Sequence, residues 1–356
     1  MTFKTRIKNF KQLFSENYKA FLITNLDNVR YLSGFTGSNG TLFLTPRKTY
    51  LFTDFRYQEQ SQKEAGKNVE IVILPANEPN AMYDFINSKN QGAIGFEKSM
   101  TVERYLKFHE KLTAELFPTD NLAEELRKIK TPDEKKNLDK AFAIADAAFA
   151  ELMKIIKPGM TEIEVAAHLE FFMKTNGSHV PSFDTIVASG ENSSSPHAKP
   201  TSKKIKEGEM VKIDFGATYN GYHSDMTRTI FMGKATKKFK EIYDIVLTAQ
   251  KKAIDAIKPG VPCKEIDAIA REHIASKGYG KNFGHGLGHA FGLQIHEKPA
   301  LSQSCEEIVQ TGHTCTVEPG IYIEGWGGIR IEDSFLVEEK GLHKFTKTPN
   351  KLLEIR

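Results

Sequence analysis

The sequence has few cysteines and no long apolar segment. Its 356 residues include three cysteines, and these show neither CxxC nor metal-ligand spacing, which is typical of reduced, largely buried thiols in a cytosolic protein. No stretch approaches the run of about eighteen apolar residues that a membrane-spanning helix needs. Residues 1–14 mix Lys, Arg and Phe at helical spacing and lack the apolar core of a secretory signal. These absences predict a cytoplasmic protein that does not insert into membranes.

Neither sign of charge dominates the chain. The formal net charge is only +4 and the lysines are scattered, which does not indicate nucleic-acid binding. With 40% hydrophobic and 26% charged residues, the composition is that of a globular protein long enough for two domains. We place the division near residue 120, with one domain at 1–120 and a second at 121–356.

Short β-type runs alternate with helical patterns in the first domain, which predicts a small α/β fold. The polar segment 120–131 predicts a connector, and Thr131-Pro132 is typical of a helix start with proline at the first helical position. A long helix is expected from there to about residue 156. The expected strands are 21–23, 41–44, 49–52, 69–74 and 93–96, and the expected helices are 55–65, 81–89 and 102–112.

Two aspartates of the second domain are predicted to share one face of a β-hairpin. Asp214 closes an apolar run, and Asp225 follows the Asn-Gly pair at 220–221, which is the strongest short-range hairpin signal. With a two-residue loop, counting back along both strands pairs Asp214 with Thr227. Asp225, two residues before Thr227, then lies diagonally opposite on the same face. Two such carboxylates repel each other unless a cation lies between them, which indicates a metal site.

Three further candidate ligands follow along the chain. Glu318 precedes a Pro-Gly turn, Glu332 lies in a segment with strand periodicity, and His289 ends the glycine-rich segment 284–289. Each of them alone would more often be a turn, capping or surface residue. Together, oxygen ligands with one imidazole suit manganese, cobalt or zinc, and four carboxylates exceed the needs of one ion. The set therefore predicts two ions about 3.5–4 Å apart.

The second domain contains an apparent internal duplication. Ile-Lys-Pro-Gly at 156–159 is followed by Glu-Ile at 162–163, and the same residues recur in the same order at 257–260 and 265–266. Each half is predicted to contain a helix that ends at Lys-Pro-Gly, a second helix, and then strands that carry candidate ligands. Pro-Gly helix stops also recur by chance. The longer match favours a duplicated α+β fold with pseudo-twofold symmetry.

The segments that contain the five candidate ligands, in their order along the chain, resemble motifs of the pita-bread metallopeptidases. This group comprises Xaa-Pro aminopeptidases, prolidases and methionine aminopeptidases. The N-terminal segments 31–38 and 52–57 are similar to the amino-terminal domain of creatinases and Xaa-Pro peptidases, which methionine aminopeptidases normally lack. The resemblance implies a creatinase/prolidase-like α/β domain at 1–120 and an α+β pita-bread catalytic domain at 121–356. The matching motifs in the catalytic domain are 185–192, 196–197, 214–217, 224–229, 285–289, 292–297, 317–320 and 330–333.

The resemblance also implies a dinuclear metal site. Five residues at matching positions would bind two divalent ions, with manganese foremost and cobalt or zinc as alternatives. Glu318 would in addition move a proton between the attacking water and the leaving proline nitrogen. The implied ligands are Asp214, Asp225, His289, Glu318 and Glu332.

Four further residues are implied to take part in catalysis. His197 and His296 would donate hydrogen bonds to the tetrahedral intermediate, and His285 would line the pocket for the proline ring. Arg330 would pair with a ligand carboxylate and keep it ionised. The serines at 193–195 precede His197 without a nucleophile elbow, so we interpret them as a mobile loop that brings His197 over the site.

The implied activity is hydrolysis of the bond before proline in peptides, by a homodimer. Ala300 stands where some prolidases have an arginine proposed to bind the dipeptide carboxylate, and Phe183 stands where some aminopeptidases have a tyrosine. The missing arginine favours an Xaa-Pro aminopeptidase acting on longer peptides, with an Xaa-Pro dipeptidase as the alternative. A creatinase-type hydrolase and a non-catalytic pita-bread protein are more remote, because no candidate ligand is missing.

Overall fold

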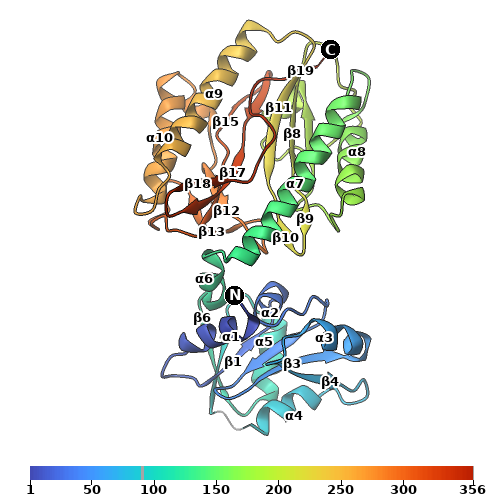
Figure 1. Cartoon of the computed structure of the whole chain (residues 1–356), viewed down its shortest axis with the longest axis vertical. Helices are drawn as coiled ribbons and strands as arrows, with labels where there is room; N and C mark the ends of the chain where they lie inside the picture. The colour runs from blue at the N-terminus through green and yellow to red at the C-terminus, as the bar shows by residue number, and fades with distance from the viewer. Residues whose placement is uncertain (90–91, 356) are drawn as a thin grey trace. The chain divides into compact units, whose positions relative to one another are not determined.

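The computed structural model describes residues 1–89 and 92–355 and shows two compact units, Met1–Arg127 and Lys128–Arg356 (Figure 1). Within these described residues, no helix combines the length and the apolar character needed to cross a membrane.

The first unit is a β-sheet with helices packed against it. Its strands are β1 (Ala20–Ile23), β2 (Thr41–Leu44), β3 (Thr49–Asp54), β4 (Glu70–Leu74), β5 (Ala93–Glu97) and β6 (Glu115–Thr119). Its helices are α1 (Phe3–Gln12), α2 (Leu26–Ser33), α3 (Gln58–Glu64), α4 (Ala81–Asn87), α5 (Val102–Lys111) and α6 (Leu122–Lys128), with a 3-10 turn η1 (Phe55–Tyr57) before α3.

The sheet of the first unit is mixed, with strand order β4-β3-β2-β1-β5-β6. β1 pairs antiparallel with β2 and parallel with β5. The predicted α/β fold and its five predicted strands are confirmed. The edge strand β6 was not predicted, because its sequence contains a proline and its side chains are only partly buried, as is usual for edge strands.

The prediction of a connector at 120–131 is wrong for most of its length, because α6 occupies it. Arg127 is 2% exposed, and its Nη1 donates to Asn28 Oδ1 at 2.8 Å. Asn28 Nδ2 in turn donates to Glu124 Oε1 at 2.7 Å. The helix buries a partly polar face against a polar partner, so the sequence shows no apolar stripe.

The second unit places pairs of helices around strands (Figure 1). Its first half contains α7 (Pro132–Ile155), α8 (Glu162–Thr175), β7 (Ile186–Ser189), a 3-10 helix η2 (Gly190–Ser194), β8 (Met210–Phe215), β9 (Thr218–Tyr219), β10 (Tyr222–His223) and β11 (Met226–Met232). Its second half contains α9 (Lys237–Ala256), α10 (Cys263–Ser276), η3 (Gly280–Asn282), β12 (Gly288–Ala290), β13 (Glu297–Leu301), β14 (Thr314–Val317), β15 (Gly320–Ile323), β16 (Gly327–Arg330), β17 (Asp333–Glu338), β18 (Gly341–Lys344) and β19 (Glu354–Ile355).

Both Lys-Pro-Gly helix stops have the same backbone geometry. Gly159 and Gly260 each have φ +94°, a left-handed conformation that glycine adopts without strain. Gly159 N–H donates to Ile205 O at 2.8 Å, and Gly260 N–H donates to Val309 O at 2.9 Å. Because α7 and α8 precede the first set of strands as α9 and α10 precede the second, the duplicated α+β fold predicted from the sequence is present.

The hairpin register is the one that the Asn-Gly turn predicts. Asn220 (φ +46°) and Gly221 (φ +69°) both have positive φ, as a tight two-residue hairpin turn requires. In the β8–β11 ladder, Asp214 pairs with Thr227. Asp225 immediately precedes β11, so the turn sequence alone brings the two aspartates together.

His313, immediately before β14, is expected to make the second unit sensitive to acid. It is 2% exposed, and its Nδ1 accepts a hydrogen bond from Gln310 N at 3.2 Å. Burial and the nearby Lys130 charge lower the pKa of His313 to about 4. The unfolded chain takes up this proton below about pH 6.5, so stability present above that pH is lost as the pH falls toward 4.

We therefore expect His313→Asn, whose amide oxygen can still accept from Gln310 N, to remove part of the acid sensitivity. Between pH 7 and pH 5 the wild type should lose on the order of 2 kcal/mol more than the variant. Urea unfolding at both pH values measures this difference. An equal loss in both proteins would show that His313 is protonated in the folded state or does not control the transition.

Candidate metal centre and active site

The residues singled out in the sequence converge on one cavity of about 850 Å³ in the second unit. They come from both halves of the duplication. Glu332 is not among the residues that line the cavity but is buried beside Asp214 and Asp225, 1% exposed. Those that line the cavity are Asp214, Asp225, His197, His285, His289, His296, Glu318 and Arg330.

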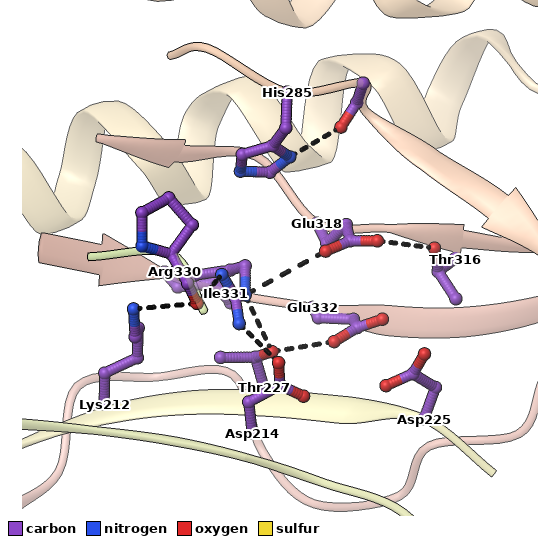
Figure 2. Close-up of polar contacts among 12 residues, drawn as sticks. Lys212, Asp214, Asp225, Thr227, His285, Thr316, Glu318, Arg330, Ile331 and Glu332 are labelled. Atoms are coloured by element: carbon purple, nitrogen blue, oxygen red, sulfur yellow. Dashed lines mark hydrogen bonds and ion pairs between the residues drawn. The ribbon is translucent and has the colours of Figure 1, made fainter. Parts of the chain in front are cut away.

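Three carboxylates form the floor of the site. Oxygen atoms of Asp214, Asp225 and Glu332 lie within 4.8 Å of one another, and all three residues are buried (Figure 2). Burial and mutual repulsion raise the pKa of Asp225 and of Glu332 well above the usual range. Within the described part of the chain, Asp214 Oδ1 and Glu332 Oε1 have no hydrogen-bond partner. Buried carboxylate oxygens without a donor are costly unless a cation satisfies them.

Glu318 and His289 complete the donor set. His289 Nε2 lies 3.5 Å from both Asp225 Oδ2 and Glu318 Oε1. Its Nδ1 lies 3.1 Å from Ala290 O, so Nδ1–H donates to that carbonyl and the Nε2 lone pair faces the carboxylates. Burial lowers the pKa of His289 to about 4 and raises that of Glu318 to about 7. A neutral imidazole nitrogen among carboxylate oxygens fits divalent-ion ligation.

Arg330 on β16 fixes the Asp214 side of the site. Its Nη2 donates to Asp214 Oδ2, its Nε donates to Thr227 Oγ1 at 3.0 Å, and its Nη1 donates to the Tyr322 hydroxyl at 2.8 Å. Thr227 Oγ1 also donates to Glu332 Oε2 at 2.8 Å. Asp214 and Glu332 therefore each have one carboxylate oxygen that accepts a hydrogen bond from the protein and one that, among the described residues, does not.

The three other histidines differ in what they can donate. His285 Nδ1–H donates to Gly286 O (2.7 Å), and its Nε2 accepts from the Tyr322 hydroxyl (2.9 Å), so neither nitrogen is left for substrate. His296 is exposed at the cavity, with its ring centroid 4.3 Å from that of His289. Burial lowers the pKa of His296. His197 follows η2 on an exposed segment at the cavity.

Sequence reasoning missed several residues that support this arrangement. Thr227 was detectable, because the predicted register already paired it with Asp214. Thr316, which donates to Glu318 Oε1 at 3.1 Å, lies two residues before Glu318 on β14. Tyr322 and Lys212 gave no local signal, because their partners lie far away in the sequence.

Comparison with known proteins shows the family. Residues 136–339 match the family model described as metallopeptidase family M24. The chain belongs to metallopeptidase family M24. Residues 6–129 match the creatinase/prolidase N-terminal domain. As an M24 metallopeptidase the protein uses divalent metal, and the more remote creatinase-type and non-catalytic alternatives are set aside.

Relatives of known structure and sequence cover nearly all of the M24 chain. The structure of the Xaa-Pro dipeptidase from Bacillus anthracis has a TM-score of 0.96 at 42% identity, covering 99% of this chain and 100% of that one. The Xaa-Pro dipeptidase of Pyrococcus furiosus is 39% identical and covers 98% of this chain and 100% of its own length. The X-Pro aminopeptidase from Thermotoga maritima has a TM-score of 0.89 at 36% identity, covering 95% and 98%. The pita-bread fold with a creatinase-type N-terminal domain is thereby confirmed.

Proposed function

We propose that the chain is an Xaa-Pro dipeptidase dependent on two divalent ions. The observation that carries the proposal is the convergence of open carboxylate oxygens and one imidazole lone pair in a single cavity. The similar proteins named as Xaa-Pro dipeptidases support this alternative better than the aminopeptidase that the sequence favoured. Manganese as the native ion, a homodimer and a cytoplasmic location remain predictions.

The proposed ligands are Asp214, Asp225, His289, Glu318 and Glu332. Ions held there would supply an acidified water and a Lewis acid for the peptide carbonyl. Glu318, whose pKa is raised to about 7 by burial, is suited to take a proton from the attacking water and to pass it to the proline nitrogen. Its Oε1 is oriented by the Thr316 hydroxyl.

Three histidines are proposed to act on the substrate in two ways. His197 and His296 line the cavity and would donate hydrogen bonds to the oxyanion that develops on the carbonyl oxygen. His285 has both ring nitrogens engaged by the protein, so we propose that its ring forms an apolar wall for proline.

Substrate length depends on what binds the free carboxylate of a dipeptide. Ala300 pairs with His289 across β12 and β13 and carries no charge, which was the reason for expecting longer peptides. Lys199, however, lines the same cavity. In the described structure its ammonium forms no ion pair, whereas Arg330 is engaged with Asp214 and Tyr322. We propose that Lys199 binds the substrate carboxylate in place of the missing arginine.

Lys199→Gln should raise KM for Ala-Pro on the order of tenfold, since one charge-assisted hydrogen bond of about 1.4 kcal/mol is lost. KM for Ala-Pro-Gly should change much less, because its carboxylate lies one residue further away. Steady-state kinetics on both peptides measures this split. Lys174→Gln, an exposed lysine at the end of α8, is the matched control. An equal change for both substrates would contradict the assignment.

The proposal itself is tested by comparing three substrates with the metal-loaded protein. We expect kcat/KM for Ala-Pro to exceed that for Ala-Pro-Gly, with little cleavage of Ala-Ala. Faster cleavage of Ala-Pro-Gly would restore the aminopeptidase hypothesis. Cleavage of Ala-Ala as fast as that of Ala-Pro would contradict the proposed specificity for proline.

A further inference from the structure

A buried lysine contacts the segment that carries His197. Lys212 on β8 is fully buried. Its Nζ donates to the carbonyl oxygens of Ser193 at 3.1 Å, Ser195 at 2.5 Å and Pro196 at 3.3 Å. Three backbone carbonyls thus lie within hydrogen-bond distance of one side-chain nitrogen. The last of the three residues immediately precedes His197.

Strand geometry places Lys212 on the side of the site. Lys212 and Asp214 are two residues apart on β8, so both side chains point to the same face. Figure 2 shows Lys212 beside Arg330. Arg330 Nη1 also donates to Pro196 O at 3.2 Å. Side chains from two different strands, Lys212 and Arg330, therefore hold the same carbonyl next to His197.

The rest of the segment is anchored on both sides of His197. Ser193 Oγ accepts from Gly328 N at 2.8 Å, and Thr201 N donates to Glu162 Oε2 at 3.0 Å. Ser193 is buried and its carbonyl is bound by Lys212, which argues against the interpretation of 193–195 as a mobile loop. His197 itself is exposed at the cavity and lies between the two anchored residues, Ser193 and Thr201.

A buried amino group is costly because it must be desolvated. An apolar side chain at position 212 would avoid that cost, so packing alone does not account for a lysine there. Its nearest acceptors are all backbone carbonyls of 193–196. Hydrogen bonds from one buried side chain to several carbonyls of the same segment suit Lys212 to fixing that segment in one conformation.

We propose that Lys212 is a positioning residue, which holds the backbone of 193–196 so that the His197 ring is presented to the oxyanion. This inference rests on the proposed role of His197 in Xaa-Pro hydrolysis. Lys212 is not among the residues that line the cavity, and its hydrogen bonds go to backbone carbonyls of 193–196, so its effect on the reaction would pass through His197. Loss of the lysine therefore removes the benefit of His197 and nothing else from the chemical step.

A double-mutant cycle tests this dependence. Lys212→Met keeps the length and bulk of the side chain, and should lower kcat for Ala-Pro at least about tenfold, part of the 10²–10³ that one oxyanion donor is worth. KM and the bound metal content should stay unchanged. In a His197→Ala background, Lys212→Met should cause no further loss of kcat. An equal loss in both backgrounds, or a loss of metal, overturns the proposal.

Two further variants keep the result unambiguous. Lys212→Arg retains a cationic donor, and any loss of kcat that it causes should also vanish in the His197→Ala background, so the cycle can be completed if the methionine variant does not fold. Lys203→Met is the control, because Lys203 bonds Ser189 and Glu209 rather than 193–196, and it should leave kcat unchanged. If wild-type protein cleaves Ala-Pro but the two losses are additive, only the role of Lys212 fails. If it does not cleave Ala-Pro, the proposed function fails first.

Discussion

Replacement of Asp225 by asparagine should abolish turnover and lower the content of bound metal. The carboxylate lies within 4.8 Å of Asp214 and Glu332 oxygens and 3.5 Å from His289 Nε2. An amide oxygen is a much weaker ligand for a hard divalent cation than a carboxylate. We expect kcat for Ala-Pro to fall by at least about 10³-fold, since a lost ion removes both the nucleophile and the Lewis acid.

Metal analysis and protein stability make this result specific. Asp225 is buried among like charges that raise its pKa, so removing the charge should not destabilise the metal-free protein. A variant that folds at least as well as the wild type without metal, yet binds less metal, identifies a ligand. Asp255→Asn, the same change at an exposed site on α9, is the control. Near-normal activity with full metal content would contradict the five-ligand assignment.

His296→Ala should lower kcat by 10²–10³ while the metal content stays unchanged, as expected for the loss of one oxyanion donor. The geometry separates the two neighbouring histidines: His289 Nε2 faces Asp225 and Glu318, whereas the His296 ring stacks edge-on against the His289 ring at 4.3 Å. Kinetics together with metal analysis measures the two effects separately. His168→Ala, an exposed histidine on α8, is the control. Loss of metal from the His296 variant would mean that the roles of the two histidines are reversed.

The sequence predicted those parts of the site that depend on local geometry. The Asn-Gly turn determines the hairpin register, so counting residues back from the turn was enough to pair Asp214 with Thr227. The repeated Lys-Pro-Gly stops likewise revealed the duplication, because glycine at positive φ ends both helices in the same way.

Features that depend on contacts between distant segments were not predictable in this way. Tyr322 meets His285 across 37 residues, and Lys212 reaches Ser195 across 17; neither contact has a periodic pattern. α6 was missed because its buried face is partly polar, with Arg127 beside Ala123. The expected preference for longer peptides rested on one absent charge at Ala300, and only the folded chain shows that Lys199 lines the same cavity.

The central claim, that this chain hydrolyses Xaa-Pro dipeptides with divalent ions held by the carboxylate–histidine cluster, is tested most directly by titration of the metal-free protein with Mn²⁺. Bound metal and Ala-Pro hydrolysis are followed in the same samples. We predict no hydrolysis without metal, a rise in activity with bound manganese and saturation at two ions per chain, as a dinuclear site requires. Full activity in the metal-free protein, or saturation of activity with no manganese bound to the chain, would contradict the account.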